Sequence, residues 1–273
     1  IMKKFKQENS IPTMKKHEKE VTMMQRNTLL EPNNLIPEWE AGGMEQKEVS
    51  QTLKVLRKKY DLIHKTVQQK QKGAKGISLI IVETDRDGFS RGRNLDKIGQ
   101  KAADTSEMFF SDVRVPVENL LGKEGGGFGV LMNELPRERI TIACRAFAEA
   151  QRAYELTVDY VKERKAFGKS IFDFQNTQFS LAEMKTSLAV GWAYLDQCLM
   201  KINDGRLTPE EGAMAKLWTT ETGNRIIDDC LQFFGGYGYM SEYPISRLYA
   251  DSRVRRIYGG SSEIMKLLIS RTV

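Results

Sequence analysis

In the second half of the chain, apolar residues recur every three or four positions, which is the period of α-helices that bury one face. Thr208 and Pro209 have the character of an N-cap and a first helical residue, and Gly235 that of a helix terminator. Shorter helices are expected over residues 242–253 and after Gly260. These elements predict an antiparallel helical bundle. Its two long apolar stripes consist of Ile140, Cys144, Phe147, Ala150, Tyr154, Val158 and Val161, and of Leu181, Leu188, Trp192, Leu195, Leu199 and Ile202.

Ahead of the bundle the period changes to that of strands. Residues 77–82 form a mostly apolar run that a polar turn at 85–88 ends, and residues 105–115 indicate a second strand. Two strands cannot form a stable sheet unaided, so partner strands must come from elsewhere. The pattern therefore predicts an α+β fold, with a partial β domain over 77–124 followed by an α-helical bundle over 125–273.

Residues 1–76 form a basic and atypical segment. Its first part, 1–47, is polar, carries three of the seven prolines and shows no sustained period, which favours disorder or an extended chain. Residues 50–72 carry one apolar seam and predict an amphipathic helix, packed on its own chain or docked on a partner. The seam consists of Leu53, Leu56, Tyr60, Ile63 and Val67.

The net charge of +6 belongs to this front segment, where 16 Lys and Arg face 9 Asp and Glu. No helix-turn-helix, zinc finger or aromatic-interleaved motif accompanies the charge, so we expect a solvated surface and no nucleic-acid partner. Glu8, Glu18 and Glu20 interrupt the segment, and no transit peptide is visible. The longest wholly apolar run is about four residues, so no membrane span is predicted.

The cysteine and histidine positions restrict the chemistry. Three cysteines, Cys144, Cys198 and Cys230, fit neither a metal site nor a disulfide scaffold, which indicates reduced thiols and no bound metal. The two histidines, His17 and His64, both precede the predicted β domain. Any chemistry after residue 64 therefore lacks an imidazole base, which excludes Ser-His-Asp and Cys-His mechanisms there.

Three glycine clusters lie at expected helix ends. Residues 125–127 precede a helix without the Gly-Lys-Ser/Thr of a phosphate loop, so a hinge is the better interpretation. Residues 235–238 and 259–260 are places where a backbone can approach a ligand closely and offer free N–H groups. Each cluster alone is weak support for a binding site.

Two carboxylates, Glu134 and Glu138, lie one helical turn apart on either side of Pro136. Proline removes a backbone hydrogen bond and bends a helix. A glutamate beside such a bend, next to Arg139, is a candidate for a base with a tuned pKa. The alternative is a surface glutamate at a kink.

Three motifs and one glutamine, in this order along the chain, resemble the acyl-CoA dehydrogenase family. They are residues 164–169 (RKAFGK) with Gln175, residues 232–239 (QFFGGYGY) and residues 257–264 (IYGGSSEI). The resemblance covers about residues 77–273, and the stretch 134–139 (ELPRER) is most similar to the long-chain branch. It implies the second half of the family's β domain and its whole carboxy-terminal bundle. The family's amino-terminal helical domain and first flavin-contacting strands are not recognisable in residues 1–76.

The resemblance implies FAD-dependent α,β-dehydrogenation of a long-chain or branched acyl-CoA to a trans-2-enoyl-CoA in fatty-acid β-oxidation. The position that carries the base in many members is Gly259 here, whereas long-chain and isovaleryl members place it at the position of Glu138. Glu138 is therefore the expected base, and Glu134 is the fallback. The backbone N–H of Gly259 is expected to bind the thioester oxygen. Residues expected to contact substrate are Pro136, Arg137, Arg139, Gly259 and Gly260.

The same resemblance implies an FAD site. Arg164 is expected at the pyrophosphate, and Phe167 and Gln175 at the adenosine end. The residues expected to line the dinucleotide from a neighbouring subunit are Gln232, Phe233, Phe234, Gly235 and Gly236, with Ser261 and Glu263 near it at a helix start.

The family further implies a homo-oligomer, specifically a dimer of dimers, with electron-transfer flavoprotein as acceptor. The location would be the mitochondrial matrix in a eukaryote or the cytoplasm in a bacterium. An oxidase on the same fold would differ in letting oxygen reoxidise the flavin. The alternative class is a truncated, non-catalytic bundle that serves as a scaffold or assembly subunit, with residues 50–72 as its docking helix.

Overall fold

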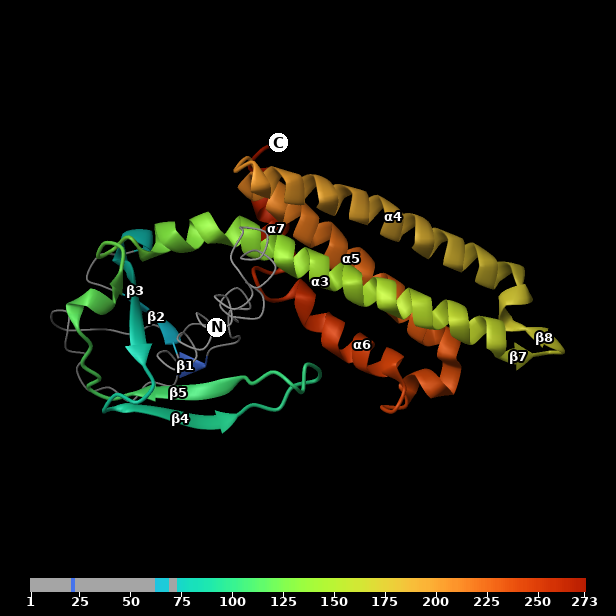
Figure 1. Ribbon diagram of the computed structural model, residues 1–273, viewed down its shortest axis with the longest axis horizontal. Coiled ribbons are helices and arrows are strands. Elements are labelled where there is room, and N and C mark those ends of the chain that lie inside the picture. Colours follow the sequence, from blue (N-terminus) through green and yellow to red (C-terminus); the bar gives the residue numbers. More distant parts are fainter. Residues whose placement is uncertain (1–20, 23–61, 69–72) are drawn as a thin grey trace, which may run out of the picture. The chain divides into compact units, whose positions relative to one another are not determined.

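The computed structural model describes residues 21–22, 62–68 and 73–273, which belong to two compact units (Figure 1). The first unit includes the described residues up to Asp96 together with 102–133, and the second includes 97–101 and 134–273. The division between the two compact units falls inside the longest helix, α3 (Gly127–Glu163). The domain boundary at 124/125 stays a prediction. The first two turns of α3, up to Asn133, belong to the first unit, and a Cβ on Gly127 would lie only 2.9 Å from the Leu79 nitrogen.

Two three-stranded antiparallel sheets form the first unit. In one, β3 (Ile77–Glu83) lies between β2 (Leu62–Gln68) and β6 (Leu120–Leu121). In the other, β5 (Ser106–Phe110) lies between β1 (Val21–Thr22) and β4 (Phe89–Asn94). Two of the partner strands, β1 and β2, thus come from the front segment, where the sequence predicts no strand.

The helix expected over residues 50–72 is wrong where the structure describes it. Leu62–Gln68 is a strand that pairs along its whole length with β3, from Leu62 opposite Glu83 to Gln68 opposite Ile77. The segment is rich in β-branched residues, and a pairing strand satisfies the backbone groups of β3, which a helix cannot do. The rest of that prediction, and all of 1–47 apart from β1, lies outside the described residues.

The strand expected over 105–115 is also shorter than predicted. It ends at Phe110 because Asp112 takes a left-handed conformation with φ of 51° and the Ser111 amide donates to the Gly88 carbonyl. Its partner β4 was missed, since arginines and a glycine hide the alternation of its sequence. Phe89 and Phe110, directly opposite each other, meet edge to face at 5.3 Å between ring centroids.

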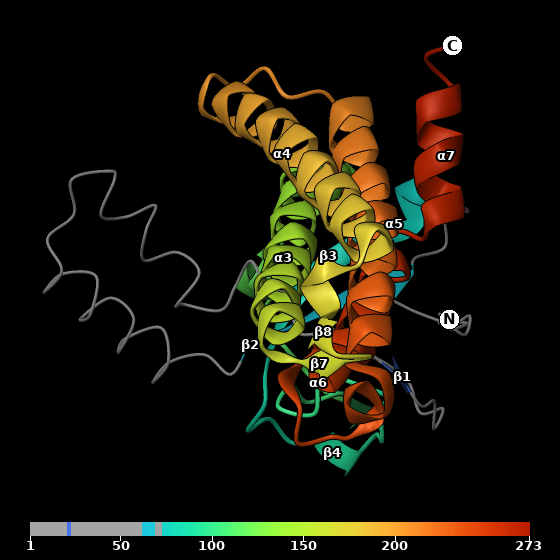
Figure 2. The same ribbon diagram turned by 90° about the vertical axis from the view of Figure 1, so that its right-hand side faces the viewer.

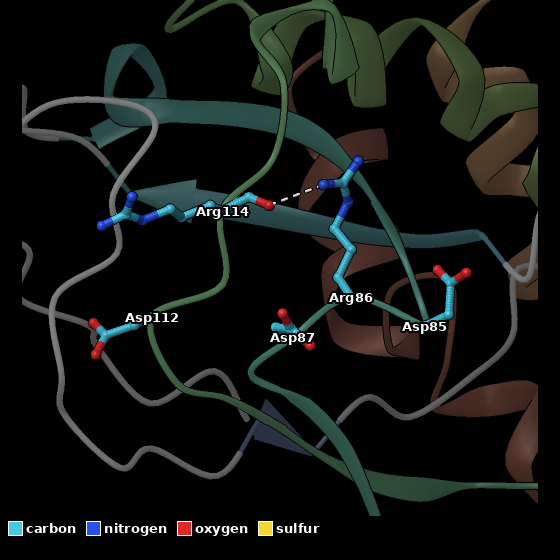
Figure 3. A pocket seen from close by; sticks show the side chains of 5 residues that line it. All are labelled: Asp85, Arg86, Asp87, Asp112 and Arg114. Carbon is cyan, nitrogen blue, oxygen red and sulfur yellow. Dashed lines mark hydrogen bonds between the residues drawn. The ribbon is translucent and has the colours of Figure 1, made fainter.

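A hollow of about 530 Å³ lies in this first unit (Figure 3). Arg86 reaches across it, and its guanidinium donates to the Arg114 carbonyl oxygen at 3.1 Å. None of the site residues expected from the sequence lines it. Its lining side chains are Asp85, Arg86, Asp87, Asp112 and Arg114.

The second unit is the predicted antiparallel bundle, which confirms the α+β fold. The helices α3, α4 (Gln175–Asn203) and α5 (Pro209–Phe234) run side by side in both views (Figures 1 and 2). The expected N-cap is present, since Thr208 accepts from the Glu211 amide and the Glu211 carboxylate accepts from the Thr208 amide. Shorter helices follow as α6 (Pro244–Ser252) and α7 (Ser262–Ser270).

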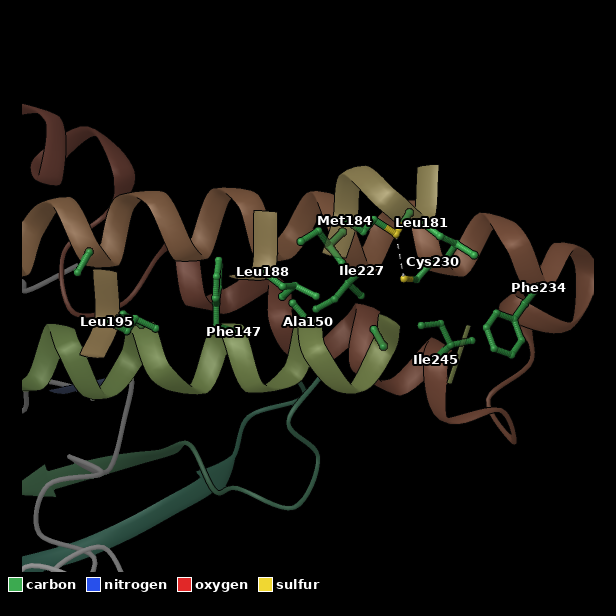
Figure 4. Packing of buried hydrophobic residues seen from close by; sticks show 14 of the residues in the cluster. Phe147, Ala150, Leu181, Met184, Leu188, Leu195, Ile227, Cys230, Phe234 and Ile245 are labelled. Carbon is green, nitrogen blue, oxygen red and sulfur yellow. Dashed lines mark hydrogen bonds between the residues drawn. The ribbon is translucent and has the colours of Figure 1, made fainter. Parts of the chain in front are cut away.

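Small and large apolar side chains interdigitate in the core between these helices (Figure 4). Phe147 of α3 is fully buried and meets the Trp192 ring edge to face. Cys230 contacts the Met184 sulfur at 3.8 Å, and all three cysteines are free. No helix within the described ranges is both long and apolar enough to cross a membrane.

The bundle is not helical throughout, contrary to the sequence-based prediction. A hairpin of β7 (Lys165–Ala166) and β8 (Lys169–Ser170) separates α3 from α4. Its turn forms at Phe167 and Gly168, whose φ angles of 52° and 81° are the positive values that a two-residue hairpin turn requires. A capping box between Ser170 and Asp173 then starts the next helical turn.

Candidate active site

Glu138 lies on α3, where its side chain is half-buried, whereas Glu134 one turn earlier is exposed. Burial raises the pKa of the Glu138 carboxyl above its ordinary value, although the positive charges of Arg139 and Lys216 act in the opposite direction. Of the two carboxylates that flank Pro136, Glu138 is therefore the one with the environment of a base.

A close approach of α5 to α3 brings Lys216 near Glu138. A Cβ on Gly212 would lie 3.0 Å from the Pro136 carbonyl oxygen, so only glycine lets α5 approach the proline-containing turn this closely. Lys216 follows one helical turn later and is fully buried. The close approach of the helices at Pro136 and Gly212 thus brings Lys216 near enough for its charge to act on Glu138.

The segment before α7 is fastened to both helices beside Glu138. Arg139, itself buried, donates from Nε to the Gly259 carbonyl oxygen at 3.5 Å. Lys216 donates from Nζ to the Gly260 carbonyl oxygen at 2.6 Å. The neighbours of Glu138 thus contact the glycines at 259 and 260, so the structure brings the expected base and the expected thioester-binding glycine close together.

Only glycine fits at position 259. Its φ is 62°, a left-handed conformation, and an added Cβ would collide with the Ile142 Cδ1 atom. The same Cβ would lie 3.5 Å from Lys216 Cε. A carboxylate side chain at this position would thus be strained, which agrees with a base on α3 instead.

Two adjacent arginines, which precede Gly259 in the sequence, bind different helices. The buried Arg255 pairs with Glu149 of α3, with Nε 3.1 Å from Oε2, and also donates to the Tyr258 hydroxyl. Arg256 donates from Nε to Glu221 of α5 at 2.8 Å. Glu221 in turn accepts from the Ser262 hydroxyl at 2.5 Å. We refer to residues 257–262, fixed in this way, as the glycine loop.

The residues expected at the flavin fall into two groups. Ser261 and Glu263 lie with the glycine loop, at the N-cap and in the first turn of α7. Arg164 lies just beyond the other end of α3, 26 residues after Glu138, or about 39 Å along a helix. Its guanidinium lies over the Tyr237 ring, 5.8 Å from the centroid.

The rest of the expected flavin residues belong to this second group. Phe167, at the hairpin tip, is 95% exposed, and Gln175, Gln232, Gly235 and Gly236 are also exposed. Phe233 is half-buried. Phe234 is different, because its buried ring stacks on Tyr160 with centroids 4.2 Å apart. That side chain is part of the core and leaves only its backbone to face a ligand.

Residues 125–273 match the family described as "Acyl-CoA dehydrogenase, C-terminal domain". The chain belongs to the acyl-CoA dehydrogenase family. It is 49% identical over 208 residues to the long-chain specific acyl-CoA dehydrogenase of Sus scrofa mitochondria, which covers 76% of this chain and 48% of that protein. It is 42% identical over 203 residues to acryloyl-CoA reductase (NADH) of Anaerotignum propionicum, covering 74% of this chain and 52% of the relative. The chain thus spans about half the length of the curated relatives it matches.

The fold agrees with solved members of the acyl-CoA dehydrogenase family. The crystal structure of acyl-CoA dehydrogenase from Geobacillus kaustophilus superposes with a TM-score of 0.76 at 45% identity, over 78% of this chain and 57% of that one. The butyryl-CoA dehydrogenase structure from Megasphaera elsdenii gives 0.75 at 33% identity, over 80% of this chain and 57% of that one.

The sequence does not predict several residues that the structure places at this site. Lys216 looks like an ordinary surface lysine in a helix, but it is the fourth residue after Gly212 and precedes Thr219 and Thr220 on a face of small residues. That spacing is the signal that could have placed it inside. Arg255 and Glu149 offer no such signal, because 106 residues separate them.

Proposed function

We propose that this chain acts in an FAD-dependent acyl-CoA dehydrogenase that converts a long-chain or branched acyl-CoA to a trans-2-enoyl-CoA in fatty-acid β-oxidation. The observation that supports this most is the half-buried Glu138, whose pKa is raised and whose neighbours Arg139 and Lys216 hold the glycine loop. A carboxylate with a raised pKa is a stronger base than one in water.

In this proposal Glu138 removes the proton from the α carbon of the thioester. That proton is very weakly acidic, so negative charge on the carbonyl oxygen must be stabilised as the proton leaves. The contacts of Arg139 and Lys216 use the carbonyl oxygens of Gly259 and Gly260. The backbone N–H of Gly259 is our candidate donor to the thioester oxygen, with Pro136 and Arg137 beside the substrate on α3.

The residues of the second group fit the pyrophosphate of FAD. Arg164 is an exposed cation over Tyr237, and nothing lies within 4 Å of a Cβ added to Gly235 or Gly236, so a ligand can approach that backbone. FAD, when bound, accepts the hydride from the β carbon. Because Arg164 and Glu138 lie about 39 Å apart along α3, we propose that each flavin contacts Glu138 of one copy and Arg164 of another.

We also propose electron-transfer flavoprotein as the electron acceptor and a homo-oligomer as the working state. A mitochondrial matrix location in a eukaryote, or a cytoplasmic one in a bacterium, goes with this function. One relative bears the name of a reductase, so the reaction should be assayed in both directions.

The test is turnover of octanoyl-CoA and palmitoyl-CoA by the purified full chain after incubation with FAD. Glu138→Gln should slow α-proton removal by about 10³-fold while leaving flavin binding unchanged, because only the base is lost. Glu134→Gln, the exposed carboxylate one turn away, serves as the matched control and should keep the wild-type rate.

An active Glu138→Gln protein would contradict the assignment of the base. A colourless wild-type protein without turnover would instead support the non-catalytic scaffold, in which the helical bundle is kept for assembly.

A further inference from the structure

Lys216 is a fully buried lysine that the proposed proton transfer does not itself use. A lysine is almost never fully buried without a partner, because removing its charge from water is costly. Its Nζ donates to the Gly260 carbonyl oxygen at 2.6 Å, and its Cε lies 3.5 Å from the Cβ position of Gly259. The side chain thus contacts both glycines of the glycine loop from the inside of the bundle.

The charges around Lys216 connect it with the base. Among the described residues, those acting on it are Arg139 and Glu138 from α3 and Glu221 from its own helix, while the glycine loop contributes a carbonyl oxygen. Burial lowers the pKa of Lys216 to about 8, with Arg139 acting in the same direction and the two glutamates opposing it. Near neutral pH the group is therefore mostly an ammonium ion beside Glu138.

We propose that Lys216 is a positioning residue for the dehydrogenation: its ammonium holds the Gly259–Gly260 backbone in place and supplies positive charge to Glu138. The inference rests on the proposed function. It assigns Lys216 two roles, one toward the glycine backbone and one toward the charge of Glu138. Arg139 donates to the Gly259 carbonyl oxygen. Among the described residues, the side-chain donor to the Gly260 carbonyl oxygen is Lys216. An apolar side chain would fill the same space and provide neither the donor nor the charge.

The test compares Lys216→Met with the matched control Lys185→Met, which removes an exposed lysine from α4. Methionine keeps the length and apolar stem of lysine, so the bundle should fold, and a second variant, Lys216→Gln, keeps a neutral donor. Hydrogen exchange of the 257–262 amides and a carboxyl NMR titration of Glu138, assigned by its loss in Glu138→Gln, need no turnover. Steady-state kinetics with octanoyl-CoA add kcat, KM and the pH profile.

In Lys216→Met, the 257–262 amides should exchange at least about tenfold faster, and Glu138 should titrate at higher pH because a neighbouring cation is lost. The kcat should fall by about 10²-fold with a smaller change in KM, since the glycine loop is displaced from the reacting carbonyl. The acidic limb of kcat/KM should move upward in pH. Lys216→Gln should restore slow exchange more than it restores the titration.

Unchanged amide exchange in Lys216→Met would overturn the proposal. Faster exchange with an unchanged Glu138 titration would also overturn it, because Lys216 would then be a purely structural contact. Wild-type protein without turnover would count against the proposed function alone. The exchange and titration results would then still decide the role of Lys216.

Discussion

At Glu138, burial favours the neutral carboxyl whereas Arg139 and Lys216 favour the carboxylate, and burial outweighs them. A carboxyl group whose folded-state pKa is raised stabilises the fold below its unfolded pKa, and this contribution is lost as pH rises through the folded pKa. At neutral pH the ionised Glu138 therefore lowers the stability of the folded chain. The same property makes it a better base.

Glu138→Gln should accordingly raise the free energy of unfolding at pH 7.5, because the neutral amide avoids the cost of burying a charge. The difference from wild type should shrink toward pH 4, where the wild-type carboxyl becomes protonated. Urea denaturation at both pH values measures it, with the exposed Glu134→Gln as a control expected to show no such change. A variant less stable than wild type at pH 7.5 would show that Arg139 and Lys216, and not burial, dominate.

Gly259→Glu should not transfer the base to the glycine loop. The residue would have to adopt a φ near 62° and displace the Ile142 side chain, at a cost of about 1–3 kcal/mol each. In a Glu138→Gln background, Gly259→Glu should therefore lower the melting temperature and leave turnover at the level of Glu138→Gln alone. Restored turnover in the double variant would mean that the loop accommodates a carboxylate.

The sequence could predict individual site residues only where a local signal exists. Glu138 could be proposed as the base because Pro136 and the ELPRER stretch mark its position. Lys216 was missed because its burial depends on how closely α5 approaches α3, which is a tertiary property. Phe234 was expected at the cofactor, yet its ring fills the core. A motif identifies a position without showing which way its side chain points.

At the scale of elements, the buried pair of Arg255 and Glu149 ties the glycine loop to α3. Arg255→Met should cost about 3–5 kcal/mol of unfolding free energy, because Glu149 is left as a partly buried charge without its partner. Replacing both residues, as Glu149→Met with Arg255→Met, should recover most of that loss. Urea denaturation of the two single variants and the double variant gives the coupling, and a double variant no more stable than Arg255→Met would refute the pair's role.

Helices were predictable from the sequence because each has a long amphipathic stripe and a recognisable end. The Thr208 cap, for instance, fixes the start of α5 within one residue. Of the strands, β3 and β5 were predictable from their apolar runs, whereas β2 was not. The apolar residues of β2 lie at spacings that also suit a helix, and its pairing with β3 decides the outcome. The short β7–β8 hairpin depends on the left-handed backbone conformation of Phe167, which nothing in the local sequence predicts.

At the scale of the whole molecule, Arg164 and Glu138 lie too far apart along α3 to serve one flavin within a single copy under our proposal. Co-expressing Arg164→Ala with Glu138→Gln should then restore about a quarter of the wild-type rate, since half of randomly formed pairs are mixed and each has one intact site. Each variant alone should be nearly inactive. The measurement is octanoyl-CoA turnover by the co-purified mixture. A mixture no better than its components would place the whole site in one copy.

The α+β class and the bundle were predictable for residues 77–273, because they follow from the order of periodic segments. The division between the units was not. Helix α3 continues through it, and no turn, proline-glycine pair or change of composition marks residues 133 and 134.

Arg255 and Arg256 are adjacent in sequence, yet one is tied to α3 and the other to α5. The glycine loop that follows is therefore anchored to two helices, and it cannot move as a lid unless both contacts break. If this chain binds a thioester as we propose, the thioester meets a surface that is already ordered, and little of its binding energy is spent on ordering that surface.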